Sequence, residues 1–230
     1  MKISILVPSR QRRNSLMQMY NSAMDMADNP RDVEVVVYAD EDDTQYNDMG
    51  FLRMKVLRGP RIVLSEMWNA CWKQAKGEYF LHAGDDLRFR SKGWDTEMTK
   101  AIDEYPKKIA VVWGDDWLDG TYRNESGTHC MVHKNWTDTV GYFVPPYFVS
   151  DYNDTFFNDL GEKLHVRKYL HHVKIEHLHF TLGKAEIDDN TRERLERHEK
   201  QHPDQIYKSD WFQAEIEQKR EALQEFIHAT

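Results

Sequence analysis

Two adjacent carboxylates, Asp85 and Asp86, follow Gly84 directly after a short apolar run at residues 79–82. Carboxylate oxygens are preferred ligands of hard divalent cations such as Mg²⁺ and Mn²⁺. Neighbouring side chains of an extended segment point to opposite sides, so we expect one carboxylate to touch the ion directly. The other would bind the ion through water or hold a hydroxyl group of the ligand. An isolated Asp-Asp pair more often lies in a solvated turn. The rest of the chain must therefore show whether this pair is a metal site or such a turn.

Two histidines, His177 and His179, add nitrogen ligands to these oxygens. They alternate within a strand predicted over residues 173–180, so both can face the same side. A neutral imidazole is a good ligand for Mn²⁺. The chain has 11 histidines, however, so a structural role for either of these two is an equal alternative.

Two further acids, Asp151 and Asp154, lie at the start of a helix predicted over residues 154–163. A carboxylate placed there can act as a general base that takes a proton from a hydroxyl group. Asp154 can instead be an N-terminal cap or a first-turn acid of the helix. The sequence leaves both roles open, because a helix N-terminus beside a cleft can host both.

The segment Pro8, Ser9 and Arg10 ends the first apolar run of the chain. A turn at this place can present backbone amides and a guanidinium to a phosphate or a base. Asp40 follows the second apolar run and can accept a hydrogen bond from a base or a ribose hydroxyl. Arg61 lies in a loop and can help to neutralise a diphosphate. Each signal is weak alone, so its value depends on the elements that position these residues.

The first half of the chain alternates apolar runs rich in β-branched residues with segments of helical periodicity. This alternation predicts an α/β domain with a mostly parallel central sheet and helices on both faces. Acids follow three of the strands, at Asp40, Asp85 and Asp115, and ligands of such sheets bind beyond the carboxyl ends of strands. We therefore expect one shared cleft there. The predicted strands are residues 3–7, 33–38, 54–57, 79–82 and 109–113, and the predicted helices are residues 14–26, 64–75 and 94–105.

Composition narrows the class of protein. At 230 residues and 40% hydrophobic content the chain can fill the core of one large domain. Its formal charge of −8 gives no electrostatic footprint for a nucleic-acid backbone, although a local basic groove is compatible with it. The two cysteines, Cys71 and Cys130, lack Cys-x-x-Cys spacing, which argues against a disulfide framework or a zinc site. No apolar run approaches the roughly 20 residues of a membrane helix, and the N-terminal run is too short for a signal peptide, so we expect a cytoplasmic setting.

Taken in order, these segments resemble the family 2 glycosyltransferases and their relatives with the GT-A fold. The match covers about residues 1–182, and the spacing of its central motifs is as in bacterial and phage members. The residues that carry it are the opening segment 3–10, the run 35–40, Asn69 with Gly77-Glu78-Tyr79, Asp85-Asp86 with Gly93-Trp94-Asp95, the helix 154–161, and Glu176-His177-Leu178-His179.

The resemblance implies an inverting transfer of a sugar from a nucleotide-diphosphate donor, a UDP-sugar first, to an acceptor hydroxyl with the help of Mn²⁺ or Mg²⁺. It implies Asp86 as the metal ligand, Asp85 as an assistant to metal or donor, and one of His177 and His179 as a further ligand. The remaining donor-binding residues would be Pro8, Ser9, Arg10, Asp40, Arg61 and Asn69.

The resemblance further implies that Asp154 is the general base, with Asp151 as the second choice. A glycan is the expected acceptor, and a hydroxylated DNA base is the second choice. The expected layout is a GT-A domain at 1–183, made of a nucleotide-sugar half (1–119) and an acceptor half (120–183), and a C-terminal helical extension at 184–230. The extension fits a cover for the sheet or a subunit contact, as in a homo-oligomer, better than an acceptor-binding lid.

One departure from the family pattern keeps two other hypotheses open. Relatives usually show Asp-x-Asp, whereas Gly84 stands at the place of the first acid. This implies metal binding that is weak, or that runs mainly through phosphates and a histidine. A non-catalytic nucleotide-sugar-binding module is therefore one alternative. A nucleotidyltransferase is the other, and the lack of glycine in residues 8–13 counts against it.

Overall fold

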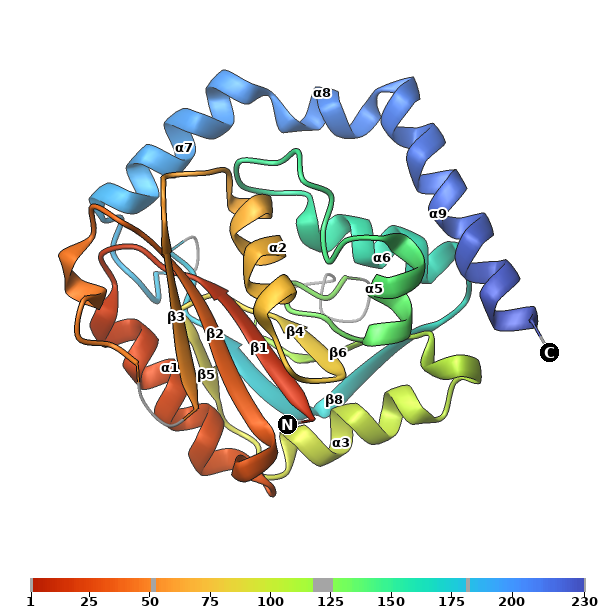
Figure 1. Cartoon of the computed structure of the whole chain (residues 1–230), viewed down its shortest axis with the longest axis horizontal. Coiled ribbons are helices and arrows are strands. Elements are labelled where there is room, and N and C mark those ends of the chain that lie inside the picture. The colour runs from red at the N-terminus through yellow and green to blue at the C-terminus, as the bar shows by residue number, and fades with distance from the viewer. Residues whose placement is uncertain (1, 51–52, 118–125, 181–182, 230) are drawn as a thin grey trace.

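The computed structural model describes residues 2–50, 53–117, 126–180 and 183–229 of the chain. Their centre is an eight-stranded sheet flanked by helices (Figure 1). In the order in which they lie in the sheet, the strands are β3 (Met54–Gly59), β2 (Val33–Asp40), β1 (Ile3–Pro8), β4 (Tyr79–His82), β7 (Met131–His133), β6 (Val111–Asp115), β8 (Arg167–His177) and β5 (Leu87–Phe89).

The sheet is mixed. Strand β1 pairs in parallel with β2 and β4, β2 with β3, and β6 with β8. Strand β7 lies antiparallel between β4 and β6, and β5 lies antiparallel against β8. Neither β5 nor β7 was predicted, because three residues are too few to show an alternating pattern. The α/β class and the parallel N-terminal half are as expected.

Alternation along the strands divides the apolar residues between two cores. Ile3, Ile5 and Val7 of β1 face one side of the sheet, and Leu6 faces the other. The first side is covered by α1 (Arg13–Met26) and α3 (Trp94–Asp103), and the second by α2 (Leu64–Gln74), α5 (Lys134–Val140) and α6 (Asn153–Lys163). Short 3₁₀ turns lie at Pro30–Asp32, Thr44–Tyr46 and Pro106–Lys108.

The C-terminal extension is helical, as the sequence predicts, and it is interrupted before Pro203 and again at Ser209. Its helices are α7 (Asp189–Gln201), α8 (Pro203–Lys208) and α9 (Asp210–His228), which trace an arc along the rim of the molecule (Figure 1). Helix α9 buries Phe212 and Ile216 in the second core. Helix α7 buries only Thr191 completely, so polar contacts rather than apolar packing hold it.

The last predicted strand differs from the structure. The strand predicted over 173–180 is β8, which begins at Arg167 and ends at His177, so the predicted bounds are wrong at both ends. His179 therefore lies beyond the strand.

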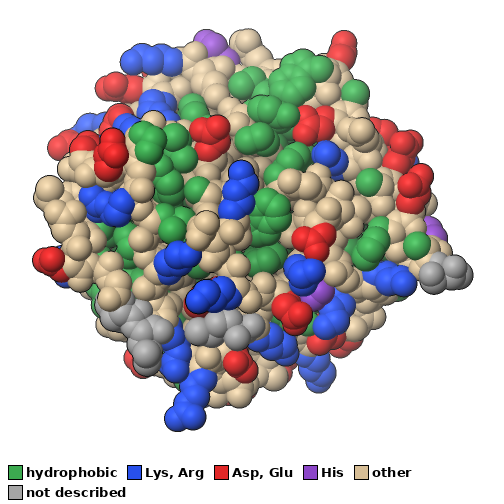
Figure 2. Space-filling view, in the orientation of Figure 1, with side chains coloured by type: hydrophobic (Ala, Val, Ile, Leu, Met, Phe, Trp, Pro, Cys, Tyr) green, Lys and Arg blue, Asp and Glu red, His purple; other side chains and the backbone are tan. Residues whose placement is uncertain are grey.

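The predicted boundary between 119 and 120 lies outside the described residues, and the boundary after 183 stays a prediction. No helix among the described residues is long and apolar enough to cross a membrane. Acidic and basic side chains are interspersed on the face of the molecule shown in Figure 2.

Because α9 packs on the domain through its apolar face, we expect two neighbouring substitutions to change the free energy of unfolding by different amounts. Phe212 is fully buried, so Phe212→Ala is expected to lower the free energy of unfolding by roughly 3–5 kcal/mol. Trp211 is 52% exposed, so Trp211→Ala is the control and should change it by less than about 1 kcal/mol. Urea denaturation followed by circular dichroism measures both. Equal effects would contradict the docking of α9 by its buried face.

Candidate functional site

A cavity of about 720 Å³ lies at the carboxyl ends of β1, β2 and β4. Asp40 and Asp85 both line it, as expected from the strand ends. Asp115 does not line it; the antiparallel strand β7 separates β6 from β4, and the Asp115 carboxylate lies 3.8 Å from Lys174 instead. The loop at 149–154 and helix α7 supply further parts of the wall.

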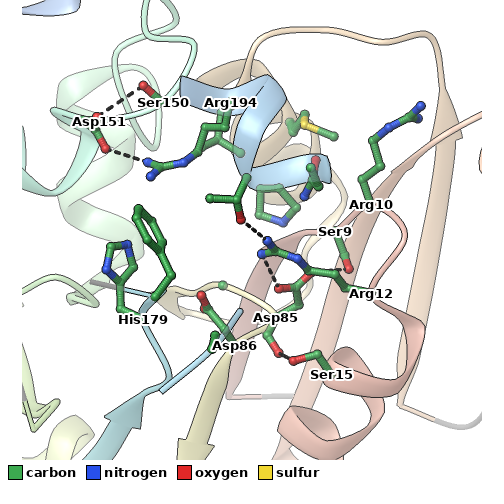
Figure 3. Close-up of a pocket in the computed structure, with 18 of the residues that line it drawn as sticks. Ser9, Arg10, Arg12, Ser15, Asp85, Asp86, Ser150, Asp151, His179 and Arg194 are labelled. Carbon is green, nitrogen blue, oxygen red and sulfur yellow. Dashed lines mark hydrogen bonds and ion pairs between the residues drawn. The ribbon is translucent and has the colours of Figure 1, made fainter. Parts of the chain in front are cut away.

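Asp85 is tied to the loop between β1 and α1. It is buried, and its Oδ2 accepts a hydrogen bond of 2.6 Å from the Ser9 hydroxyl. Its Oδ1 lies 3.6 Å from the Arg12 guanidinium, and its main-chain oxygen accepts a bond from the Ser15 hydroxyl. Burial, and then the charge of Asp86, raises the pKa of Asp85 above its usual range. Arg12 and Ser15 are site residues that no sequence motif indicated (Figure 3).

Asp86 faces the opposite way, toward β8. Its Oδ2 lies 3.3 Å from His177 Nε2, and its main-chain oxygen accepts a hydrogen bond from the Leu178 amide. Burial acts to raise the pKa of Asp86, but the contact with His177 outweighs it and holds the pKa below its usual range. A β-carbon at Gly84 would lie 2.6 Å from Asp86 Oδ1. An acid at position 84 would therefore force the Asp86 carboxylate to turn, which gives the departure from Asp-x-Asp a physical reason.

The two expected histidine ligands lie together, although the strand ends between them. The rings of His177 and His179 are 4.9 Å apart, and burial lowers the pKa of His179. Asp86 Oδ2 and His177 Nε2 are close enough to share an ion, and His177 Nδ1 is buried without a partner among the described residues. Within the same residues, no three His, Cys, Asp or Glu side chains already surround one point. This pair thus brings together one oxygen and one nitrogen donor, both of types that Mn²⁺ accepts.

Asp40 lies at the other end of the cavity, held by two arginines. Arg10 and Arg61 donate to its Oδ2 at 2.9 and 3.0 Å. Its Oδ1 is buried and has no partner among the described residues. Burial raises the pKa of Asp40 despite both arginines. The arrangement leaves one buried acceptor oxygen unpaired, while both arginines bond the other oxygen of the same carboxylate.

The two candidate bases differ in their surroundings. Asp154 lies in the first turn of α6, lines the cavity, and accepts a hydrogen bond of 2.9 Å from the Thr155 amide. Burial raises its pKa to about 6. Asp151 also lines the cavity but is exposed, with oxygens 3.0 Å from Arg194 and 2.7 Å from His198.

Asn69 has a structural place instead of lining the cavity. Its side-chain nitrogen donates to the Val144 carbonyl at 2.7 Å, and its oxygen accepts from the amides of Phe143 and Val144. This amide thereby fixes the loop after α5 against α2. The remaining predicted residues, Pro8, Ser9, Arg10, Arg61, Asp86, His177 and His179, all line the cavity.

Helix α7 closes one side of the cavity through ion pairs with residues of the site. Asp188, its N-cap, makes two 2.7 Å contacts with Arg12. The further pairs are Glu193 with Arg61 at 2.6 Å, His198 with Asp151 at 2.7 Å, and Arg194 with Asp151 at 3.0 Å, the last visible in Figure 3. The extension thus contributes to the site.

Solved structures with a similar fold include proteins in complex with nucleotide sugars. S. aureus TarS 1–349 in complex with UDP-GlcNAc has a TM-score of 0.58 and 18% identity, covering 100% of this chain and 74% of that one. The mannosyltransferase PcManGT from Pyrobaculum calidifontis, in complex with GDP-Man and Mn²⁺, has a TM-score of 0.60 and 12% identity, covering 100% and 70%. Identities this low show the GT-A fold alone.

Other comparisons define the extent of the match. In a second structure of TarS 1–349 the chain covers 59% of that protein's length, and in a longer TarS it covers 36%. No curated protein matches the sequence. The model of the family described as glycosyl transferase family 2 matches residues 4–192, which is most of the 230 residues and extends into α7. The chain belongs to glycosyl transferase family 2.

Proposed function

We propose that this protein transfers a sugar from a nucleotide-diphosphate donor to an acceptor hydroxyl, with inversion at the anomeric carbon. The observation that carries the proposal is that one cavity collects Asp40, the pair Asp85-Asp86 and Asp154. These acids match the three tasks of the reaction, which are holding the nucleoside, holding the diphosphate and accepting a proton. Membership of the family, and relatives solved with UDP-GlcNAc or GDP-Man, support the same reaction.

The proposed chemistry is a direct displacement. The acceptor oxygen attacks the anomeric carbon, and the bond from that carbon to the diphosphate oxygen breaks with its electron pair leaving on the diphosphate. Asp154 takes the acceptor proton as attack proceeds. Its pKa of about 6 leaves it mainly ionised at neutral pH while keeping it a stronger base than an ordinary aspartate. Asp151 is already paired with Arg194 and His198, which lowers its availability as the base.

Asp86 and His177 would hold Mn²⁺ or Mg²⁺, with His179 beside them. Such an ion, when bound, supplies positive charge to the leaving diphosphate. Asp85 serves a different task, because its oxygens are turned toward Ser9 and Arg12. It positions the loop that carries Arg12, whose guanidinium faces the cavity and can add to the same neutralisation.

The surroundings of Asp40 favour a uracil base. Uracil presents one N–H between two carbonyl oxygens, so its edge reads acceptor, donor, acceptor. Asp40 Oδ1 offers a single unpaired acceptor for that N–H, and Arg10 and Arg61, which bond Asp40 Oδ2, bring further N–H groups to the same end of the cavity for the carbonyl oxygens. Cytosine has an acceptor at the central position and guanine has two adjacent donors, so neither matches as well. A UDP-sugar is therefore the proposed donor.

The setting proposed for this reaction is the cytoplasm. Cys71 and Cys130 are both free and buried, as suits a reducing compartment. The proposed acceptor is a glycan hydroxyl, approaching on the side of Asp154.

The metal assignment predicts a metal-dependent rise in thermal stability. A UDP-sugar with Mn²⁺, at about 100 times Kd, should stabilise the fold by about 2.7 kcal/mol and raise Tm by roughly 5–10 °C. Asp86→Asn is expected to abolish the part of the shift that needs Mn²⁺ and to keep the part due to the nucleotide. The exposed Asp48→Asn serves as the control. No Mn²⁺-dependent shift with UDP, GDP or CMP sugars would sink the metal assignment.

The base preference is tested by nucleotide affinity. Wild-type protein should bind UDP at least about tenfold more tightly than CDP or GDP in isothermal titration calorimetry, since a mismatch leaves a buried polar group unpaired. Asp40→Asn should remove most of this preference. Asp42, which is exposed and also pairs with Arg10, provides the matched control as Asp42→Asn. Equal affinity of the wild-type protein for all three nucleotides would refute uracil selection.

The general base predicts a pH profile. Transfer should fall about tenfold per unit as pH drops below about 6, because a carboxylate with a raised pKa becomes protonated there. Asp154→Asn should reduce turnover by about 10²–10⁴-fold and leave the Kd of the donor unchanged. Asp151→Asn is the comparison variant, and assays of sugar transfer or donor hydrolysis measure both. Turnover that survives Asp154→Asn but not Asp151→Asn would assign the base to Asp151.

A further inference from the structure

Two histidines that the proposed mechanism does not use also line the cavity, His82 at the end of β4 and His129 just before β7. Each imidazole forms a hydrogen bond with the backbone of the segment that carries the other histidine. His82 Nδ1 lies 3.2 Å from the Thr128 carbonyl oxygen, and His129 Nδ1 lies 3.2 Å from the His82 carbonyl oxygen. A carbonyl oxygen can only accept, so Nδ1 carries the proton in both rings. These two bonds fix both imidazoles to the backbone.

With the proton on Nδ1, the Nε2 atom of a neutral imidazole is an acceptor only. The Nε2 atoms of His82 and His129 are both buried, and neither has a partner among the described residues. His82 is 4% exposed, and burial lowers its pKa to about 4, which keeps the ring neutral. Buried acceptors without partners are rare because an unmade hydrogen bond destabilises the fold. Two such acceptors lining one cavity call for a ligand that brings donors.

The position of these rings identifies which part of the donor they would meet. The His129 ring packs edge-on against His177 at 4.7 Å, and His177 contacts Asp86. On its other side the same segment reaches α6, since the Gly127 amide donates to Asn158 at 2.8 Å. The Asn158 side chain in turn donates to the main-chain oxygen of Asp154 at 2.8 Å. The segment 127–129 thus spans from the diphosphate end of the site to the proposed base.

In a direct displacement, the transferred sugar lies between the departing diphosphate and the base. The sugar ring therefore lies beside residues 127–129. Its hydroxyl groups are the donors that the unpaired Nε2 atoms of His82 and His129 require. The Trp68 ring packs on His82 with centroids 4.0 Å apart and also lines the cavity. Its indole N–H is already donated to the carbonyls of Leu6 and Ala83, so it presents an apolar face, as sugar C–H groups favour.

We propose that His82 and His129 form the subsite for the transferred sugar, each accepting a hydrogen bond from a sugar hydroxyl through Nε2. The subsite rests on the proposed glycosyl transfer and adds to it the residues that select the sugar. The ligand class is a nucleotide-linked hexose with hydroxyl donors on the face turned toward β4 and β7. Binding of a metal ion by the same nitrogens is the competing outcome.

Asparagine and glutamine variants separate the two nitrogens of each ring. In His129→Asn and His82→Asn the amide nitrogen can replace Nδ1, and the Nε2 acceptor is lost. In His129→Gln and His82→Gln an amide oxygen can replace Nε2. Calorimetry gives Kd for UDP and for whichever of UDP-glucose, UDP-galactose and UDP-N-acetylglucosamine the wild type binds most tightly. The asparagine variants should weaken UDP-sugar binding about 5- to 10-fold and leave UDP binding within about twofold. The glutamine variants should lose less of their affinity for the UDP-sugar.

Monodeoxy UDP-sugars add a test that does not depend on the stability of the variants. Removing the hydroxyl that meets a histidine should weaken binding to the wild type and have no further effect on the matching asparagine variant. Equal loss of UDP and UDP-sugar binding would overturn the subsite, as would UDP-sugar affinities that the variants leave unchanged. A weaker Mn²⁺ affinity, measured by electron paramagnetic resonance, would assign the nitrogens to the metal instead. Failure of the wild type to bind any nucleotide sugar would refute the proposed function itself.

Discussion

Two adjacent carboxylates in the wall of one cavity need compensation of their negative charge from different directions, and much of the architecture provides it. Asp85 turns toward the loop after β1, where Ser9 and Arg12 meet it, and Asp86 turns toward His177 at the end of β8. Two like charges side by side oppose each other's ionisation, so each carboxylate has partners of its own, and burial and the charge of Asp86 still raise the pKa of Asp85. The pair therefore joins the first strand of the fold to its last one across the end of β4.

The pairing of β5 with β8 makes this arrangement possible. Residues 87–89 lie antiparallel to 175–177, so the chain leaving the Asp85-Asp86 turn runs directly along the strand that ends in His177. Gly84 leaves the Asp86 carboxylate free to point at that histidine. A departure from the family's usual motif thus accompanies a local geometry in which one acid faces the proposed ion and the other holds the neighbouring loop.

The same principle of shared charge extends to the C-terminal extension. Helix α7 has little apolar contact with the domain, yet it pairs Asp188 with Arg12 and Glu193 with Arg61, two cations that also face the cavity. Surface ion pairs of this kind each contribute little to stability. A bound diphosphate would compete for these arginines, so the placement of α7 and the charge state of the cavity are physically connected.

The sequence by itself determined the elements and the chemistry of their ends. Continuous apolar runs rich in β-branched residues specified the parallel strands, and two of the acids that follow them, Asp40 and Asp85, indicated where the cavity lies, because parallel strands end at one edge of the sheet. The sequence alone could not identify Arg12, His82 or His129 as site residues. Nor could it assign Asn69 to a loop contact or predict that α7 lies over the cavity. These features join residues up to 179 positions apart, as in the bond from Arg12 to Thr191. Such long-range contacts leave no local pattern in the chain, so only the tertiary structure decided them.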